Sequence, residues 1–401
     1  MTETSDQESL GQRIRGARES LGLRQEELAQ QVGFRSRQIL SDLERGTRSV
    51  KTSELLLIAR ALHTDVSTLL QPTAPQPSAV FWRTAPAEGS EQVKSEFLLW
   101  CERYSRLLKL AGVRHEDLMP SFHLDLGSMR FSDSEELASN LSDMLDLGVR
   151  PAAVLREALE SQLGVLVWYL ETGSESSAAC SRGDFGSAIL VPRANAPWRR
   201  NFDIAHEMFH LLTWEASSHL SQDGDLAKRT ERLANCFAAA LLLPRKPLLQ
   251  DFNDRLIEGA ISVGDLIRVA RDYGVSTEAL LWRLLNLGRF GSAEQVRGLL
   301  EDPTLRELDR RSKEGMWNEP PRLPRRFVTL AYRAMLRGRL SRAVLAEYLG
   351  CGLSDLAAAL AEFGVLDYLQ SADGEELPST TEAADGQERC DDPESSPLCF
   401  A

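Results

Sequence analysis

Apolar residues recur at intervals of three and four positions through the first seventy residues of the chain. This spacing places them on one face of successive helices and predicts a compact bundle of four or five short helices over 9–70. Gly33 lies between two of these helices, in a short turn of the kind that joins helices at a steep angle. The apolar positions of the predicted bundle are Leu10, Ile14, Ala17, Leu21, Leu28, Ala29, Val32, Ile39, Leu43, Leu55, Ile58, Ala59 and Leu62.

The segment 71–91 has no periodicity and contains four prolines, which predicts a linker. Beyond it, long segments at helical spacing predict helices, and short apolar runs predict strands. The predicted helices are one that carries Phe97, Trp100, Cys101, Tyr104, Leu107 and Leu108, followed by 150–162, 201–214 and 226–243. The predicted strands are 163–171 and 187–192.

The chain from 251 to 370 follows a pattern of short helices, and within it LSRAVLAEYLGCGLSDLAAAL has the cadence of a second helix-turn-helix. Such a segment is either a second surface for DNA or a partner, or a helical cap on the preceding domain. The apolar periodicity favours the cap, because it mostly marks buried core. The last segment, 371–401, holds nine acidic residues and one Arg, and is predicted to be a disordered tail.

The bulk composition indicates two or three domains with a sizeable core, since the chain has 401 residues of which 43% are hydrophobic. No apolar run reaches the roughly 18 residues that would span a bilayer, and the polar N-terminus is unlike a signal peptide. We therefore expect a cytoplasmic protein without a membrane partner. Six cysteines without a CxxC pair argue against a disulfide framework and a zinc ribbon.

The net charge of −13 is unevenly distributed along the chain. Residues 9–70 hold ten Lys and Arg against seven Asp and Glu, whereas the tail is strongly acidic. A basic first segment on an acidic whole is consistent with a small DNA-binding domain attached to another unit. A solvated basic face remains the alternative on charge alone.

The run LRQEELAQQVGFRSRQILSDLERG, followed by LLLIARALHTDVSTLL, resembles the XRE (Cro/CI-type) helix-turn-helix family. The resemblance implies that the second helix of the motif enters the major groove of double-stranded operator DNA, and that the protein is a homodimer on paired half-sites. It departs from the family at Arg24, where a Ser or Thr cap is usual, and at Val50-Lys51. The alternative is a protein-interaction bundle. The DNA-facing residues that the resemblance implies are Gln25, Arg35, Ser36, Arg37, Gln38 and Ser41.

His206-Glu207-Met208-Phe209-His210 forms an HExxH pattern within a segment free of helix breakers. Two His residues four positions apart on a helix project from one face and can bind one metal ion, and the Glu beside them can take a proton from a metal-bound water. The alternative is a His pair packed in the core or solvated.

A catalytic zinc needs a third protein ligand. Ala216 stands where a metzincin would have a His, which excludes that class. Glu231 is favoured, because Ala234, Asn235 and Ala238 share its helical face and would let its helix approach the HExxH helix closely. Alternatively, Glu231 only favours the first turn of its own helix by charge. The candidates considered are Glu215, His219, Asp223, Asp225 and Glu231.

WRRNFDIAHEMFHLLTW and ERLANCFAAALLLP together resemble the ImmA/IrrE metallopeptidase family, over roughly 145–250. The resemblance implies His206, His210 and Glu231 as ligands of Zn²⁺, or of Mn²⁺, and Glu207 as the catalytic general base. Phe209 departs from the family, which commonly has Gly at that position. A bulky side chain there would narrow the cleft or replace a close contact between helices.

These patterns predict a mostly α protein with a small β-sheet (α+β). Its predicted parts are a DNA-binding bundle over 9–70, a linker over 71–91, a zincin-like domain over 92–250, a helical region over 251–370 and the acidic tail. The expected function is a DNA-binding transcriptional regulator whose zinc-dependent peptidase domain cleaves a partner repressor or itself on a signal. The alternatives are a non-catalytic regulator with a ligand-sensing or structural metal pocket, and one half of a toxin–antitoxin or phage-immunity system.

Overall fold

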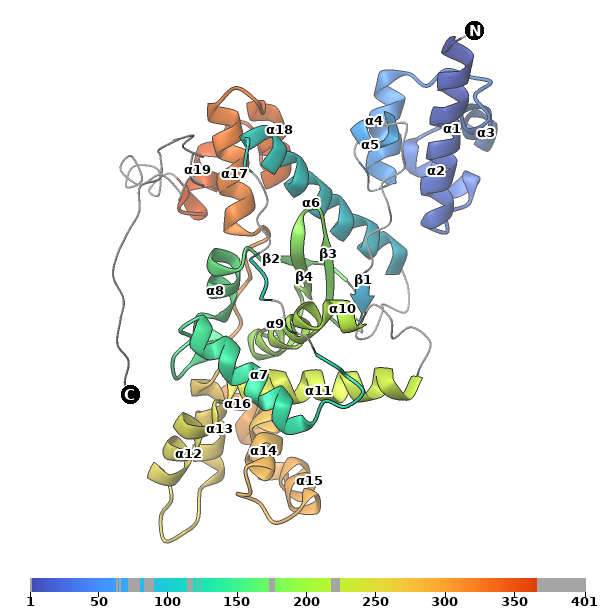
Figure 1. The fold of residues 1–401 in the computed structure, drawn as a ribbon. Helices are drawn as coiled ribbons and strands as arrows, with labels where there is room; N and C mark the ends of the chain where they lie inside the picture. The colour runs from blue at the N-terminus through green and yellow to red at the C-terminus, as the bar shows by residue number, and fades with distance from the viewer. Residues whose placement is uncertain are drawn as a thin grey trace, which may run out of the picture.

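The computed structural model describes residues 2–62, 64, 66–70, 80–82, 90–113, 118–120, 122, 124–172, 177–217 and 224–365. Over this part of the chain the protein is mostly helical, with one four-stranded sheet, which confirms the predicted α+β class (Figure 1). The predicted acidic tail lies outside the described residues. None of the helices described is long and apolar enough to cross a membrane.

The N-terminal bundle forms a hydrophobic core of its own. Leu28, Leu40 and Ile58 lie at its centre and are each fully buried. Gly33 takes a φ of 79° at the end of the second helix, a conformation that a residue with a Cβ atom adopts at a cost. The helices are α1 (Thr2–Ser20), α2 (Gln25–Val32), α3 (Arg37–Glu44), α4 (Thr52–Ala61) and α5 (Val66–Leu70).

The sheet has the strand order β1-β3-β4-β2. Strand β2 runs parallel to β4, β3 runs antiparallel to β4, and β1 adds antiparallel to the outer side of β3. Two of these strands were predicted from their apolar runs, whereas β3 and β1 were not, and β1 lies inside the segment expected to be a linker. The bounds are β1 (Val80–Trp82), β2 (Leu166–Leu170), β3 (Ala179–Gly183) and β4 (Gly186–Pro192).

Alternate residues of each strand enter two different cores, because successive side chains of a strand point to opposite faces. In β2, Val167 and Tyr169 join the core on one face, and Leu166, Trp168 and Leu170 join the core on the other. Both faces are therefore covered, which explains why β2 and β4 are buried along their whole length and read as unbroken apolar runs.

One face of the sheet is covered by the two helices that carry the HExxH pattern and Glu231, together with the helices around them. In Figure 1 this layer lies below the sheet, and it continues downward as a group of short helices. The helices are α7 (Phe131–Met144), η1 (Pro151–Ala153), α8 (Leu155–Gln162), α9 (Pro197–Leu212), α10 (Trp214–Ser217), α11 (Gly224–Leu242), α12 (Arg245–Asp254), α13 (Val263–Asp272), α14 (Thr277–Asn286), α15 (Ala293–Glu301) and α16 (Pro303–Ser312).

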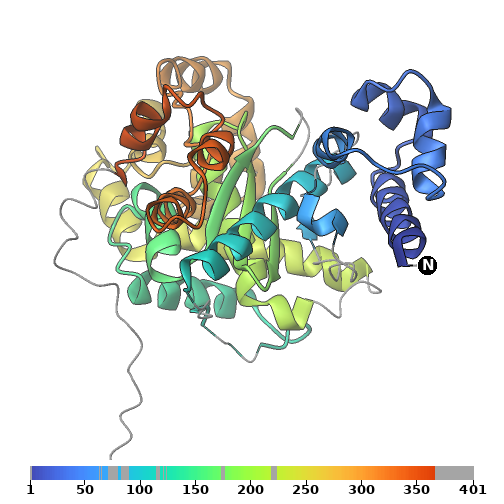
Figure 2. The same ribbon diagram turned by 90° about the horizontal axis from the view of Figure 1, so that it is seen from above.

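The opposite face packs on α6 (Ser90–Ala111), α17 (Arg325–Leu336), α18 (Arg342–Leu349) and α19 (Leu356–Glu362). Figure 2, seen from above, shows α6 crossing the sheet with the C-terminal helices beside it. An aromatic group fixes this layer: Trp100 stacks on Trp168 with ring centroids 5.4 Å apart, and Phe327 meets Trp168 edge-on at 5.3 Å. The segment with helix-turn-helix cadence thus contributes Leu345, Leu356 and Leu360 to a core shared with the sheet, as the cap interpretation expected.

Candidate metal centre and DNA-recognition helix

The predicted site residues of the central domain lie on two packed helices, α9 and α11. Pro197 occupies the first turn of α9, where its fixed φ suits a helix start and its missing N–H leaves no bond unmade. From Ile204 to Leu212 every residue is buried, because this half of α9 is enclosed by the sheet on one side and α11 on the other. On α11, Ala234 and Ala238 are fully buried and let the two helices approach closely.

The structure brings His206, His210 and Glu231 together. The Nε2 atoms of the two His residues are 3.2 Å apart. Nε2 of His206 lies 3.2 Å from Oε2 of Glu231, and Nε2 of His210 lies 3.3 Å from Oε1 of the same carboxylate. No other group of three or more His, Cys, Asp or Glu side chains converges in this way among the described residues.

These separations fit a tetrahedral metal ion. Zinc–ligand distances of about 2.0–2.2 Å in a tetrahedron place neighbouring ligand atoms about 3.3–3.6 Å apart. The observed separations, 3.2, 3.2 and 3.3 Å, lie at or just below the lower limit of that range, with a different oxygen of Glu231 facing each His. Three protein ligands also leave one tetrahedral position open, which is the arrangement of catalytic rather than structural zinc sites.

The remaining candidates for the third ligand are placed elsewhere or lie outside the described residues. Glu215 lies on α10 and lines a separate small pocket with Trp214. Asp225 lies in the exposed first turn of α11, 3.9 Å from Lys228. His219 and Asp223 fall in the undescribed stretch 218–223.

Asn235 holds His206 in one orientation. Its Oδ1 atom lies 3.1 Å from Nδ1 of His206, one helical turn beyond Glu231 on α11. Because an amide oxygen only accepts, this contact places the proton on Nδ1 and leaves Nε2 with the lone pair that a metal requires. The sequence analysis assigned Asn235 only to a face of small residues, and its role as the partner of His206 became visible in the structure.

Asn235→Ala is expected to weaken metal binding about 10- to 100-fold, because the ring of His206 would lose the contact that fixes its tautomer and orientation. The check is titration calorimetry with Zn²⁺ on the full chain. Asn253→Ala, at an exposed position of α12, serves as the matched control. Unchanged zinc affinity in Asn235→Ala would show that the contact does not support the metal centre.

Glu207 lies on the sheet side of the centre and is almost fully enclosed, with 1% of its surface exposed. Neither carboxylate oxygen accepts a hydrogen bond from a nitrogen or oxygen in the described part of the chain, and the neighbouring donor is the thiol of Cys180 on β3. Burial raises the pKa of Glu207 to about 7, and the nearby Asp203 and Glu231 add to this, while His210 and the thiol of Cys180 on β3 oppose it. A buried carboxyl group with a pKa near 7 is matched to taking up and releasing a proton at neutral pH.

Glu231 has the opposite electrostatic environment. Burial opposes ionisation of this carboxyl group, but hydrogen bonds and positive charge from His206 and His210 in their protonated, metal-free forms outweigh it and hold the pKa of Glu231 well below its usual range. The carboxyl groups of Glu207 and Glu231, which lie on neighbouring helices, are therefore suited to different roles. Glu231 is an anion suited to ligation, and Glu207 is poised to exchange a proton.

Phe209 lies between the ring of His210 and the neighbouring helix α11. It is fully buried and packs on Phe237 of α11 with ring centroids 5.6 Å apart. Its bulk therefore replaces a close contact between the two helices, which is one of the two outcomes expected for this position. The same ring also meets the ring of His210 edge-on, with centroids 5.9 Å apart.

A cavity of about 1000 Å³ lies between α7, α9, α11 and α14. Asn235 and Phe202 form part of its wall, so it reaches the residue that contacts His206. Its lining combines aromatic rings with cationic groups, among them Trp198, Trp282, Arg199, Arg232 and Lys313.

The predicted DNA-contacting residues lie together on the N-terminal bundle. Arg37, Gln38 and Ser41 belong to α3, and Ser36 is its N-cap. Arg35, Ser36, Arg37 and Gln38 are exposed, and Ser41 is half-buried. Side chains at the start of α3 are thus presented outward, as a helix that enters a major groove requires.

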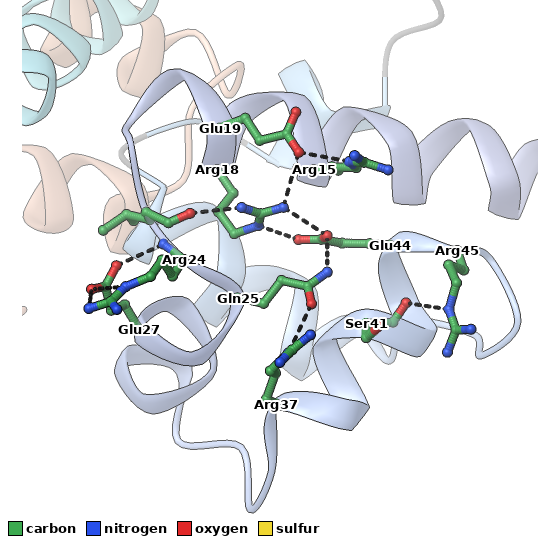
Figure 3. Close-up of polar contacts among 11 residues, drawn as sticks. Arg15, Arg18, Glu19, Arg24, Gln25, Glu27, Arg37, Ser41, Glu44 and Arg45 are labelled. Carbon is green, nitrogen blue, oxygen red and sulfur yellow. Dashed lines mark hydrogen bonds and ion pairs between the residues drawn. The ribbon is translucent and has the colours of Figure 1, made fainter.

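Gln25, at the start of α2, links the recognition helix to a buried ion pair (Figure 3). Its Oε1 accepts from Nε of Arg37 at 3.3 Å, and its Nε2 donates to Oε2 of Glu44 at 2.7 Å. Glu44 in turn accepts from Nε of Arg18 at 2.6 Å. The side chain predicted to reach a phosphate is therefore held in place from inside the bundle.

Comparison with known proteins divides the chain in the same way. Residues 14–69 match the helix-turn-helix family, and residues 160–285 match the family described as the IrrE N-terminal-like domain. The propionyl-CoA carboxylase regulator of Cereibacter sphaeroides is 27% identical over 312 residues, covering 70% of this chain and 66% of that protein's length. A crystal structure of Bacillus thuringiensis PlcR with the peptide PapR7 and DNA aligns with 92% of this chain and 100% of its own, at 10% identity and a TM-score of 0.15, too low to indicate a shared arrangement. The chain therefore joins an XRE-type helix-turn-helix domain to an IrrE N-terminal-like domain.

Proposed function

We propose that this protein is a transcriptional regulator that binds operator DNA as a homodimer and hydrolyses a peptide bond, in a partner repressor or in itself, at a zinc centre. The observation that carries the proposal is the convergence of His206, His210 and Glu231 at tetrahedral spacing beside a buried Glu207. A structural zinc site would have four protein ligands and no need of an adjacent buried acid.

The bound metal would polarise the scissile carbonyl and lower the pKa of its bound water toward neutrality. The remaining steps of the proposed hydrolysis would be carried out by side chains of this protein. Asn235 fixes the ring of His206, Glu231 supplies a stable anion, and Glu207 accepts a proton and returns it to the leaving amine. Mn²⁺ suits the same set of nitrogen and oxygen donors and is the second metal to test.

The regulatory part of the proposal is supported by the exposed polar residues of α3 and by the relative's name. Arg37 and Gln38 can each make two hydrogen bonds to a base edge in the major groove, and both are exposed. The relative from Cereibacter sphaeroides is named as a regulator. Homodimer formation would place two such helices on paired half-sites about 34–36 Å apart.

Removal of the metal is the first test. The chelator-treated protein and a Glu231→Ala variant are both expected to lose stoichiometric zinc, since two His ligands alone hold the ion at least about 100-fold more weakly. Metal analysis measures the loss directly. Electrophoresis after incubation with Zn²⁺ or Mn²⁺ then follows cleavage of the chain itself and of candidate repressors. Cleavage that persists in Glu231→Ala at the wild-type rate would contradict the proposed centre.

A second candidate function is a non-catalytic switch in which a ligand reports to the DNA-binding domain. The specific observation in its favour is the cavity of about 1000 Å³ whose wall includes Asn235, the partner of His206. Under this alternative His206→Ala changes DNA binding or folding, while Glu207→Gln behaves as the wild type. A peptidase gives the reverse pattern for Glu207→Gln in a cleavage assay.

A further inference from the structure

Strand β1 pairs with β3 although it lies in the segment between the DNA-binding bundle and the IrrE-like domain. It consists of three residues only, Val80–Trp82, and follows the outer side of β3 in antiparallel register. Phe81 lies directly opposite Cys180 in this pairing. Without β1, β3 would be the edge of the sheet.

The edge of β3 runs beside the metal centre. Cys180 is fully buried on the face of the sheet that meets α9, and β3 packs directly on this helix, which carries His206, Glu207 and His210. Residues directly opposite one another in an antiparallel pair project to the same face. Phe81 therefore points to the side of the sheet that carries the proposed general base.

Phe81 packs on α10, just beyond the C-terminal end of the metal-binding helix α9. Its ring meets Trp214, four positions after His210, edge-on with centroids 4.6 Å apart. It also packs on the core that contains α9 and α11, whereas Val80 packs on the core of the opposite face. Backbone pairing with β3 and the contact between Phe81 and Trp214 thus hold the extended segment Val80–Trp82 along the outer edge of β3.

An exposed sheet edge binds an extended peptide by adding it as a further strand, in which backbone groups supply the affinity and pockets for alternate side chains supply the specificity. We propose that the outer edge of β3 is the rim on which this peptidase binds its substrate as an antiparallel strand, and that Val80–Trp82 occupies the rim as an internal competitor. The inference rests on the proposed peptidase function and names its substrate class: an extended peptide with an aromatic residue that takes the place of Phe81 against Trp214.

A three-residue strand is a weak competitor, because it forms few ladder bonds and isolated short strands are marginal. A longer substrate would displace it by pairing with all of β3 from Ala179 to Gly183. Displacement would release the chain that leads to the DNA-binding bundle. Binding of substrate to the IrrE-like domain would in this way change how the DNA-binding bundle is connected to it.

The test uses binding rather than turnover. The full-length Glu207→Gln protein, in which cleavage is blocked, is titrated against a fluorescein-labelled peptide with the sequence of residues 77–84, PSAVFWRT, and anisotropy is recorded. Phe81→Ala added to this background is expected to tighten peptide binding about tenfold, because the internal segment loses its aromatic contact. In the Phe81→Ala background, where the internal segment no longer uses Trp214, the further change Trp214→Ala is expected to weaken peptide binding. Trp317→Ala, which truncates a large exposed aromatic residue elsewhere, should leave the affinity unchanged.

Hydrogen exchange on the protein without the Phe81 substitution provides a second measurement that does not depend on how a variant folds. At saturating peptide, the amides of 80–82 should exchange faster while those of 179–183 remain protected. Equal peptide affinity with and without Phe81→Ala, or continued protection of 80–82 at saturation, would overturn the proposal. Displacement without any metal-dependent cleavage of the wild type would keep the binding rim and refute the peptidase. Metal-dependent cleavage without displacement of residues 80–82 would support the peptidase and refute the proposed substrate-binding edge.

Discussion

Glu207→Gln is expected to lower the rate of peptide-bond hydrolysis about 100- to 10,000-fold, the usual contribution of a positioned general base. The amide fills the same buried space but cannot accept the proton. Because Glu207 is not among the three converging ligands, the variant should retain stoichiometric zinc and unchanged operator affinity. Initial rates of cleavage, metal content and DNA binding measured on one preparation test all three statements.

Glu160→Gln is the matched control for this experiment. Glu160 on α8 is also buried, and burial raises its pKa to about 7, with Arg156 opposing the shift. Both substitutions therefore remove a buried carboxyl group of the same acidity, but only Glu207 lies beside the His–His–Glu group. Hydrolysis should be preserved in Glu160→Gln, and equal rates in wild type and Glu207→Gln would exclude Glu207 as the base.

Glu44→Ala is expected to destabilise the N-terminal bundle by about 3–5 kcal/mol, the cost of leaving one member of a buried ion pair without its partner. Two oxygens of Glu44 accept from Nε and Nη2 of Arg18 at 2.6 and 3.1 Å, and the two side chains are 2% and 9% exposed. A loss of this size is a large part of the stability of a small domain. Operator binding at 37 °C should fall with it, because Gln25 and Arg37 lose the anchor shown in Figure 3.

Hydrogen exchange of the buried amides in α2 and α3 reports the stability of this bundle separately from the rest of the chain. Glu27→Ala is the control, because its partner Arg24 is largely exposed and such pairs contribute little. The double variant Arg18→Met, Glu44→Leu should recover most of the loss, since an apolar pair leaves no buried charge. If Glu44→Ala exchanges no faster than Glu27→Ala, the ion pair does not stabilise the bundle.

The site could be predicted where it depended on short-range spacing. His206 and His210 share a helix face by their four-residue separation, and Glu231 was favoured from the small residues that follow it on the same face. The contact between Asn235 and His206 needs the relative rotation of two helices, which spacing within either one does not determine. The position of Phe209 against Phe237 is of the same kind, so the sequence could only offer two outcomes for it.

The fold was predicted where the apolar pattern was strong. Strands β2 and β4 are continuous apolar runs and were expected, but β3 has the sequence ACSRG, which lacks the bulky β-branched residues that mark a strand. Strand β1 is three residues in a segment with four prolines, and its pairing with β3 joins positions about a hundred residues apart in the chain. Local propensity carries no information about such a partner.

The three hydrophobic cores also determine the order in which parts of the chain can fold during synthesis on the ribosome. Every residue of the N-terminal core lies between Leu10 and Leu69, so this domain can fold as soon as that stretch has emerged. The core behind the sheet joins Phe97 to Val365, and closing such long-range contacts requires nearly the whole of the described chain. A nascent or truncated chain can therefore complete its helix-turn-helix domain before the IrrE N-terminal-like domain has assembled.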